Sequence, residues 1–470
     1  MIIFTHHTGE PHGILGAQVA ATFFHRKLSI PSIVVGIERN FSKERLLHFV
    51  TEYCAGKWSP TDDAAGPTHR PSEATSRSKS KDGGPLLRED KVVAFSHLCG
   101  RPDLFDLIQE LKQRGFITIL GGPHARQDYM GEPDTDLYPH RFKGLKSVVD
   151  IAFQGPVNRL QSEHLGSGDG LLEYPWARDI FMEVDWSNMY TFSDTLRKIE
   201  VQFGQVLNTI GCAYASKPQT VTLLPPANLR GSGIPEFEVQ TEGCIFCDVS
   251  RDKGYHGSVA RDKAITQIAR LPEVDGTKIP FELIDEYPIR SLGKLLEETE
   301  RQKIKVSQVN LVCRVDDINS HASDLVDIMS IARRLGVRIM FASIGFESFS
   351  DRLLRYFCKG ITVADIVRCV ETLRHLKDKF GSYFVYRRDE GADHGFIRPT
   401  PWDDGETLQE MDRNIFLYRL YEDILPDHST PLIIHHASYL GDWIRQIEST
   451  AGVTFPRVGT WIEWWNPSFR

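Results

Sequence analysis

The sequence lacks the features that direct a chain to a membrane, to a secreted scaffold or to bulk nucleic acid. No uninterrupted apolar run approaches the length of a bilayer span, and the eight cysteines scattered over 470 residues do not form a secreted disulfide framework. The net charge of −8 argues against broad, non-specific binding of nucleic acid. The first residues, Met-Ile-Ile-Phe-Thr-His-His, are typical of a strand and not of a signal peptide. We therefore expect a cytoplasmic protein in a reducing compartment, with no membrane or nucleic-acid partner.

What is present is the composition of an ordinary globular protein, with 41% hydrophobic residues and room for two or three domains. Residues 1–156 alternate apolar strand-like runs with amphipathic helical patterns, which predicts a doubly wound, Rossmann-like α/β domain. After the N-terminal strand, further strands are expected at 33–37, 91–95 and 116–120. The helix between the last two strands places four apolar residues on one face, namely Leu104, Leu107, Ile108 and Leu111.

The rest of the chain divides by changes in pattern. Residues 58–90 are rich in Ser, Pro, Gly, Asp and Lys, so we expect a flexible surface insertion within the first domain. Residues 157–205 are predicted to be a connector. From 206 to 400 the strand–helix alternation resumes and predicts a full or partial β/α barrel. Residues 401–470 are predicted to be mostly helical and aromatic, and to close the substrate side. The expected barrel strands include 281–284, 308–312, 338–341 and 383–386.

Three short motifs follow predicted strands of the first domain, where doubly wound sheets bind ligands. Paired glycines in one of them let a bulky ligand approach the backbone closely. The motifs are EPHGILG at Glu10–Gly16, SHL at Ser96–Leu98 and GGPH at Gly121–His124. Their positions predict a ligand site at one edge of this domain.

The second domain carries Cys244 and Cys247 in a Cys-x-x-Cys motif, and Cys212 in a Gly-Cys-Ala-Tyr context upstream. Iron–sulfur clusters normally take four cysteine ligands, so three thiolates leave one iron open to a substrate or cofactor. Zinc sites and redox dithiols use the same short spacing, and both remain as alternatives.

Together these motifs resemble those of radical S-adenosylmethionine (SAM) enzymes that carry an N-terminal cobalamin-binding domain. The first-domain motifs are similar to the Asp-x-His-x-x-Gly, Ser-x-Leu and Gly-Gly motifs of the cobalamin-binding domain. Here Glu10 replaces the aspartate and one extra residue precedes Gly16. The resemblance to the radical SAM domain runs from about 206 to 402. It is carried by three blocks, which lie at Cys244–Gly257, Ser343–Thr362 and His394–Trp402.

The resemblance implies that cobalamin binds to the first domain. Its nucleotide tail would lie beside two loops, which contain Ser96, Leu98, Gly121 and Gly122. His12 would be the cobalt ligand, as the corresponding histidine is in the cobalt-ligating members of the family. Because the first motif departs from the family pattern, an ordinary loop histidine is the alternative for His12.

The family's cluster ligands have the spacing Cys-x3-Cys-x2-Cys, which would place the first ligand at Gln240, a residue that cannot serve. We interpret Cys212 as this ligand, separated from Cys244 by an inserted loop, rich in Pro and Gly, that returns the chain to the cluster. Cys212, Cys244 and Cys247 would then hold a [4Fe–4S] cluster. The alternative is that Cys212 is a buried structural cysteine and the cluster is lost or differently ligated.

In this family the methionine part of SAM chelates the open iron. By position, Asp285 and Glu286, just after the strand at 281–284, would hold the amino group by charge-assisted hydrogen bonds. Glu347 would bind the ribose hydroxyls and Arg314 the carboxylate. The alternative for each of these residues is a solvated strand end or a salt bridge. No catalytic residue is assigned.

The resemblance also implies the chemistry. An electron from a reductase, a flavodoxin or a ferredoxin would reach the cluster, and SAM would be cleaved to a 5′-deoxyadenosyl radical. The most common outcome for this architecture is methylation of an unactivated carbon, with methylcobalamin delivering the methyl group to a small-molecule or peptide substrate. Two alternatives remain. One is a radical rearrangement or cyclisation without methyl transfer, and the other is a degenerate relative that only binds a ligand or zinc.

Overall fold

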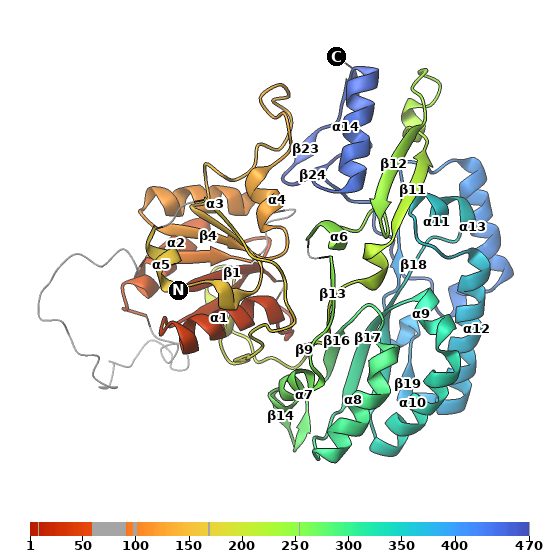
Figure 1. Ribbon diagram of the computed structural model, residues 1–470, viewed down its shortest axis with the longest axis horizontal. Helices are drawn as coiled ribbons and strands as arrows, with labels where there is room; N and C mark the ends of the chain where they lie inside the picture. Colours follow the sequence, from red (N-terminus) through yellow and green to blue (C-terminus); the bar gives the residue numbers. More distant parts are fainter. Residues whose placement is uncertain (8, 59–90, 97–100, 168–169, 253, 470) are drawn as a thin grey trace, which may run out of the picture. The chain divides into compact units, whose positions relative to one another are not determined.

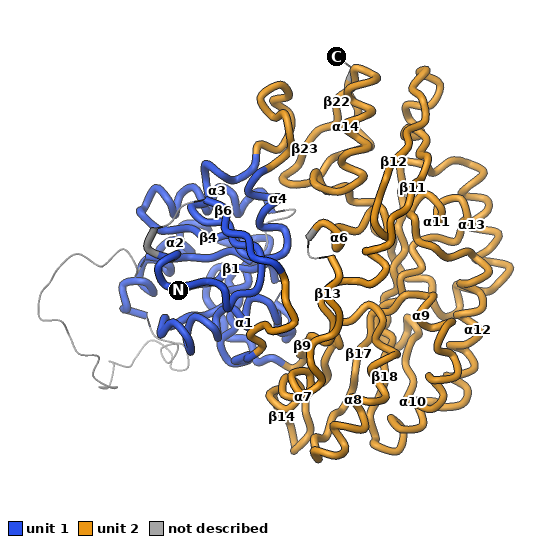
Figure 2. The backbone as a smooth tube through the Cα atoms, in the orientation of Figure 1, with its two compact units in different colours: residues 1–130, 144–175, 183–201 blue, residues 131–143, 176–182, 202–470 orange. Residues whose placement is uncertain are grey.

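The chain forms two compact units, each with its own parallel sheet (Figures 1 and 2). The computed structural model describes residues 1–7, 9–58, 91–96, 101–167, 170–252 and 254–469. Unit 1 comprises residues 1–130, 144–175 and 183–201, and unit 2 comprises residues 131–143, 176–182 and 202–470. Apart from its first residue, the predicted insertion at 58–90 lies outside the described residues.

Unit 1 is built on an eight-stranded sheet with the order β6-β5-β4-β3-β1-β2-β7-β8. Neighbouring strands are parallel except for the antiparallel pair β7 and β8. The strands are β1 (Ile2–His6), β2 (Ile33–Ile37), β3 (Val92–Phe95), β4 (Ile117–Gly121), β5 (Ile151–Gln154), β6 (Gly170–Glu173), β7 (Met189–Phe192) and β8 (Leu196–Lys198). The strand order reverses between β1 and β3, because the chain leaves β1 towards β2 and resumes on the other side of β1. This topology confirms the predicted doubly wound sheet.

Helices cover both faces of this sheet, which explains why its central strands are nearly continuous apolar runs. The helices are α1 (Leu15–Lys27), α2 (Lys43–Cys54), α3 (Pro102–Gln113), α4 (Ala125–Met130) and α5 (Ser162–Ser167). Figure 1 shows α1 and α3 on opposite sides of the strands. All four apolar residues predicted on one face of α3 are buried.

The segment 157–205, which we expected to be a connector, contributes strands to both sheets. It supplies β6, β7 and β8 to unit 1 and β9 (Gly204–Leu207) to unit 2. These strands are only three or four residues long. Such short runs give too little periodicity to be distinguished from an irregular linker.

Unit 2 contains a parallel six-stranded sheet in the order β19-β18-β17-β16-β9, with β20 paired to β18. Its remaining strands are β16 (Phe281–Ile284), β17 (Gln308–Arg314), β18 (Arg338–Glu347), β19 (Phe384–Val385) and β20 (Gly395–Phe396). The helices that alternate with them or flank them are α7 (Arg261–Ala269), α8 (Ile289–Arg301), α9 (Val315–Ser320), α10 (Ala322–Leu335), α11 (Asp351–Tyr356) and α12 (Val363–Phe380). This arrangement confirms the predicted partial β/α barrel.

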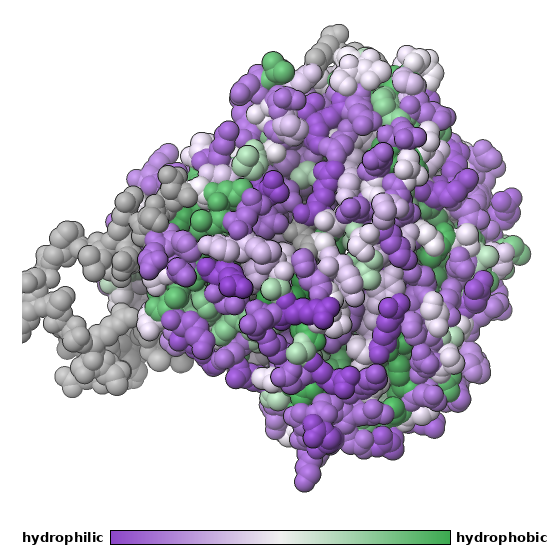
Figure 3. Space-filling model, viewed as in Figure 1, coloured by the Kyte–Doolittle hydropathy of each residue, from purple (hydrophilic) through white to green (hydrophobic). Residues whose placement is uncertain are grey.

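The helices of unit 2 are amphipathic. In α8 the apolar residues Ile289, Leu292 and Leu296 are buried, while the opposite face carries charged residues. Hydrophilic side chains cover most of the face seen in Figure 3, and hydrophobic ones gather only in small patches. None of the helices in the described part of the chain combines the length and the apolar character of a membrane-spanning helix.

Two further parts of unit 2 flank the barrel. The first surrounds the cysteines in sequence, and its elements are β10 (Thr209–Gly211), β11 (Pro218–Leu223), β12 (Phe237–Glu242), α6 (Val249–Asp252) and β13 (Tyr255–Ser258). The second is the C-terminal segment, in which α13 (Gly405–Leu417) and α14 (Tyr439–Ala451) confirm the predicted helices. Short strands not predicted from the sequence are β14 (Glu273–Val274), β15 (Thr277–Lys278), β21 (Ile434–His435), β22 (Val453–Thr454), β23 (Arg457–Val458), β24 (Trp461–Ile462) and β25 (Ser468–Phe469).

Candidate functional site

Three cysteines from two separate segments of unit 2 lie in one cluster. Cys212 directly follows β10, and Cys244 and Cys247 follow β12. Cys212 and Cys244 are buried together with Tyr214, and Cys247 packs against them. The structure therefore brings together the three residues that we predicted as cluster ligands. Their role as ligands stays a prediction.

The segment between Cys212 and Cys244 is an antiparallel β-hairpin of β11 and β12. Pro218 pairs with Glu242 at its base and Leu223 with Phe237 near its tip. Beyond the base, the amide of Gly243 donates to the carbonyl oxygen of Lys217 at 2.9 Å. The hairpin thus leaves and re-enters the site at the same place, as expected for an insertion between two ligands.

Gly243 allows the two cysteine segments to come this close. Its φ is +69°, and a Cβ atom at this position would lie 2.6 Å from the Cα atom of Ala215. Any larger residue would push the Cys244 segment away from the segment that carries Cys212.

The donor set fits an iron–sulfur cluster with one open iron. Cys212, Cys244 and Cys247 offer three thiolates at one largely buried place, and such clusters normally take four cysteine ligands. Zinc also takes cysteine thiolates and stays the alternative.

Burial also sets the chemistry of these thiols. It raises the pKa of the Cys247 thiol to about 12, and burial and the charge of Glu286 raise the pKa of the Cys212 thiol. Because the thiolate is the form that attacks a disulfide and also the form that binds a metal, either role requires these buried thiols to lose their protons.

Arg314, at the end of β17, contacts the cysteine cluster directly. Its Nη1 atom donates to the Sγ atom of Cys244 at 3.3 Å, and its Nε atom donates to Asp316 at 2.8 Å. Its Nη2 atom donates to the carbonyl oxygen of Lys359 at 2.7 Å, and the ring centroid of Tyr214 lies 3.8 Å from the guanidinium carbon. Guanidinium carries five N–H donors, so these contacts leave the predicted binding of the SAM carboxylate as an open prediction.

Glu347, the last residue of β18, has an unusual backbone conformation. Its φ is +63°, a value that costs free energy in a non-glycine residue and that often marks a functional site. The Nζ atom of buried Lys359 donates to its Oε1 atom at 2.9 Å. The carboxylate is thus held in a fixed position at the carboxyl edge of the sheet. Its predicted contact with ribose stays a prediction.

Asp285 and Glu286 behave differently although they are adjacent. The carboxylate of buried Asp285 accepts from Asn208 at 2.5 Å, from Thr209 at 2.9 Å and from the amide of Tyr287 at 2.9 Å. These donors favour a structural role that joins β16 to the β9–β10 turn. The charge of Glu286 instead acts on Cys212 and Cys247. The hydrogen bonds to Asp285 disfavour its predicted contact with the SAM amino group, and the contact of Glu286 stays a prediction.

His394, in the block that supports the resemblance, is a structural residue. Its Nδ1 atom accepts from the Ile344 amide at 3.0 Å, and its Nε2 atom donates to the Tyr386 carbonyl oxygen at 2.8 Å. Burial lowers the pKa of His394 to about 4, so the ring is neutral at pH 7. It fastens β18 to the segment before β20.

In unit 1 the predicted cobalamin loops follow β1, β3 and β4, on both sides of the point where the strand order reverses. This is the edge where doubly wound sheets bind ligands. Gly122, with a φ of +109°, lies so close to the Ser96 loop that a Cβ atom would be 2.6 Å from the Ser96 carbonyl oxygen. Gly121 ends β4, and Leu98 lies outside the described residues. The absence of a side chain at Gly122 lets the loops after β3 and β4 lie against each other.

His12 is exposed on the loop after β1, and the structure adds a histidine that we did not predict. His7 is buried, accepts from the Gly9 amide at 2.9 Å through Nδ1, and contacts the His12 carbonyl oxygen through Nε2 at 3.2 Å. Since Nδ1 accepts, Nε2 carries the proton and donates. The ring therefore orders the loop that presents His12. The sequence feature that could have pointed to His7 is its position directly after the first strand.

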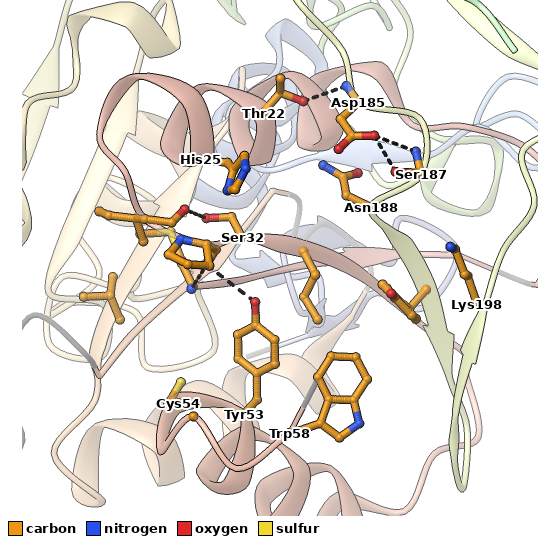
Figure 4. A pocket seen from close by; sticks show the side chains of 17 residues that line it. Thr22, His25, Ser32, Tyr53, Cys54, Trp58, Asp185, Ser187, Asn188 and Lys198 are labelled. Atoms are coloured by element: carbon orange, nitrogen blue, oxygen red, sulfur yellow. Dashed lines mark hydrogen bonds between the residues drawn. The ribbon is translucent and has the colours of Figure 1, made fainter. Parts of the chain in front are cut away.

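A cavity of unit 1 lies elsewhere. It has a volume of about 530 Å³, and Met1, Ile33 and Val92 place it at the amino ends of β1, β2 and β3. Figure 4 shows Tyr53 and Trp58 on one side of it. Because it lies at the opposite edge of the sheet from the loops after β1, β3 and β4, it is not part of the predicted cobalamin site.

Comparison with known proteins gives a match in fold. No family model matches the chain, and no curated protein matches it in sequence. The cobalamin-dependent SAM radical enzyme OxsB, solved with aqua-cobalamin bound, matches 100% of this chain with a TM-score of 0.55 and 10% identity. This likeness confirms the predicted fold. The chain spans 64% of the length of OxsB. Elp3 of the archaeon Methanocaldococcus infernus matches 40% of this chain and 44% of its own at 16% identity, but its TM-score of 0.23 carries no argument.

Proposed function

We propose that this chain is a cobalamin-dependent radical SAM enzyme that methylates an unactivated carbon of a small-molecule or peptide substrate. The observation that carries the proposal is the meeting of Cys212 with Cys244 and Cys247, despite the hairpin between them. The contact of Arg314 with Cys244 places this cluster at the carboxyl edge of the parallel sheet. The match to the OxsB fold supports the same assignment.

Different residues of the chain would bind the different cofactors. Cys212, Cys244 and Cys247 would hold a [4Fe–4S] cluster with one open iron, and Glu286 and Glu347 would orient SAM from neighbouring strand ends. The unit 1 loops would hold cobalamin, with Gly122 keeping the loops after β3 and β4 close together. When bound, these groups would supply reductive cleavage of SAM and a methyl carrier. A flavodoxin or ferredoxin is the proposed electron donor.

The proposal is tested without knowledge of the substrate. The chain is reconstituted anaerobically with iron, sulfide and cobalamin, and is then given a chemical reductant and SAM labelled in its methyl group. We expect 5′-deoxyadenosine from SAM cleavage, together with label on cobalamin. Cleavage without any transfer of label to cobalamin would favour the alternative of a radical rearrangement or cyclisation. Bound zinc without sulfide would favour a non-catalytic relative.

The cobalamin site is tested separately with Gly122→Ala. The new Cβ atom would lie 2.6 Å from the Ser96 carbonyl oxygen, so one of the two loops must move away from the ligand. We expect the Kd for cobalamin to rise at least about tenfold, a loss of about 1.4 kcal/mol of binding free energy. The Kd is measured by titration followed by visible absorption.

Gly115→Ala is the matched control for Gly122→Ala. Gly115 has a φ of +80° and open space around its Cβ position, so this variant reports backbone strain alone. Iron and sulfide content should match the wild type in both variants, because the cysteines belong to unit 2. An unchanged Kd in Gly122→Ala would show that cobalamin does not bind at these loops.

A further inference from the structure

The guanidinium of Arg314 lies against a cysteine sulfur, a contact that binding of SAM does not require. Its Nη1 atom donates to the Sγ atom of Cys244 at 3.3 Å, and the side chain is buried. We propose that Arg314 is a positioning residue that raises the reduction potential of the cluster, through this hydrogen bond and through its fixed positive charge. The inference rests on the proposed function, since it needs a cluster on the three cysteines.

The surroundings of Arg314 fix the direction of this hydrogen bond. Asp316 accepts from Nε, the carbonyl oxygen of Lys359 accepts from Nη2, and the ring of Tyr214 covers the flat face of the guanidinium. The donors of arginine form a rigid planar fork, so two anchors and a stacked ring determine where Nη1 points. It points at Cys244, and thermal motion of the side chain does not readily break the contact.

Electrostatics then determines the sign of the effect. Reduction moves one electron from the reductant onto the cluster, and no bond to Arg314 forms or breaks. Arginine keeps its proton in proteins, so the charge beside Cys244 is permanent. A cation and a hydrogen bond to a cluster sulfur stabilise the more negative, reduced state more than the oxidised state. Burial strengthens both effects because water does not screen them. The ion pair with Asp316 offsets part of the charge but not the hydrogen bond.

The test compares the wild type with Arg314→Met and Arg314→Lys after anaerobic reconstitution. Iron and sulfide content report the amount of cluster, and EPR during a redox titration reports its midpoint potential. We expect Arg314→Met to keep its cluster. Its ratio of reduced to oxidised cluster at a fixed potential should fall about tenfold, which is about 59 mV for a one-electron couple. Arg314→Lys keeps the charge but not the fork, so its midpoint should lie between those of the other two proteins.

Arg338→Met is the matched control, because Arg338 is exposed at the amino end of β18, the opposite edge of the sheet. Its midpoint should equal that of the wild type. An unchanged midpoint in Arg314→Met at full iron content would overturn the proposal. If Arg314→Met binds no cluster, a wild-type midpoint in Arg314→Lys would overturn it. If the wild type itself binds neither iron nor sulfide, the proposed function fails and this inference fails with it.

Discussion

Cys212→Ala is expected to abolish cluster assembly, lowering iron and sulfide from about four each per chain to near zero. Cys212 and Cys244 are buried in one cluster with Cys247 packed against it, so the variant would leave only two of three candidate ligands. Two thiolates hold a four-iron cluster poorly when one iron must also stay open. The measurement is anaerobic reconstitution of wild type and variant, followed by iron and sulfide analysis and visible absorption. SAM cleavage should be lost with the cluster.

Cys369→Ala is the matched control for Cys212→Ala. Cys369 is fully buried on α12 and lies outside the cysteine cluster, so its replacement tests the loss of a buried thiol alone. It should retain a full cluster. A full cluster in Cys212→Ala would instead make Cys212 a structural cysteine, and the split ligand set would be wrong.

The meeting of Cys212 and Cys244 was predictable from the residues around them, but the form of the insert was not. Its prolines and glycines indicated a loop, whereas the structure has a regular hairpin. The strands carried a signal that we did not use. In β12, Val239 and Thr241 are buried and their neighbours are exposed, which is the alternation of a two-residue period. Composition hid the pattern because most of the prolines and glycines lie in the connection between the strands, and Pro218 begins the first strand.

The strands of both sheets were predictable for a different reason. A parallel strand in the middle of a sheet is buried on both faces, so β2 and β3 appear in the sequence as apolar runs, Ile-Val-Val-Gly-Ile and Val-Val-Ala-Phe. The sequence order of such runs, with helices between them, predicts the topology. Short strands such as β7 and β8 contain too few residues to form a recognisable apolar run. Their places are known only from the sheet in the structure.

Contacts between distant residues could not be predicted from the sequence. Arg314 was predicted from its place at a strand end, but its hydrogen bond to Cys244 depends on how the hairpin returns the chain. The same holds for the internal donors that occupy Asp285, which come from residues around the β9–β10 turn. Local sequence patterns predict that a side chain lies at an edge of a sheet. They do not predict which distant residue forms a hydrogen bond with it.

A buried charge network in unit 2 gave no signal in the sequence at all. Glu448 of α14 is fully buried and accepts from Arg457 at 2.7 Å and from Arg141 at 3.1 Å. Glu132, also fully buried, pairs with Arg457 at 3.2 Å and with Arg445 at 3.6 Å. Glu132 and Arg141 belong to the segment 131–143, which Figure 2 colours with unit 2 although the chain on either side belongs to unit 1. The network therefore ties this excursion of the chain to the C-terminal helix.

Glu448→Gln is expected to destabilise unit 2 by about 3–5 kcal/mol, because it leaves buried Arg141 without its carboxylate partner and leaves Arg457 with Glu132 alone. At about 2–4 °C per kcal/mol for a domain of this size, the Tm of unit 2 should fall by about 10 °C, measured by calorimetry. The loss should change little between low and high salt, since the pairs with Arg141 and Arg457 are shielded from the solvent. Glu300→Gln is the control: Glu300 pairs with Arg334 on the surface, and its loss should cost less than about 1 kcal/mol. Equal Tm values for the two variants would mean that the buried network adds no net stability. It would then serve only to fix the conformation of the segment 131–143.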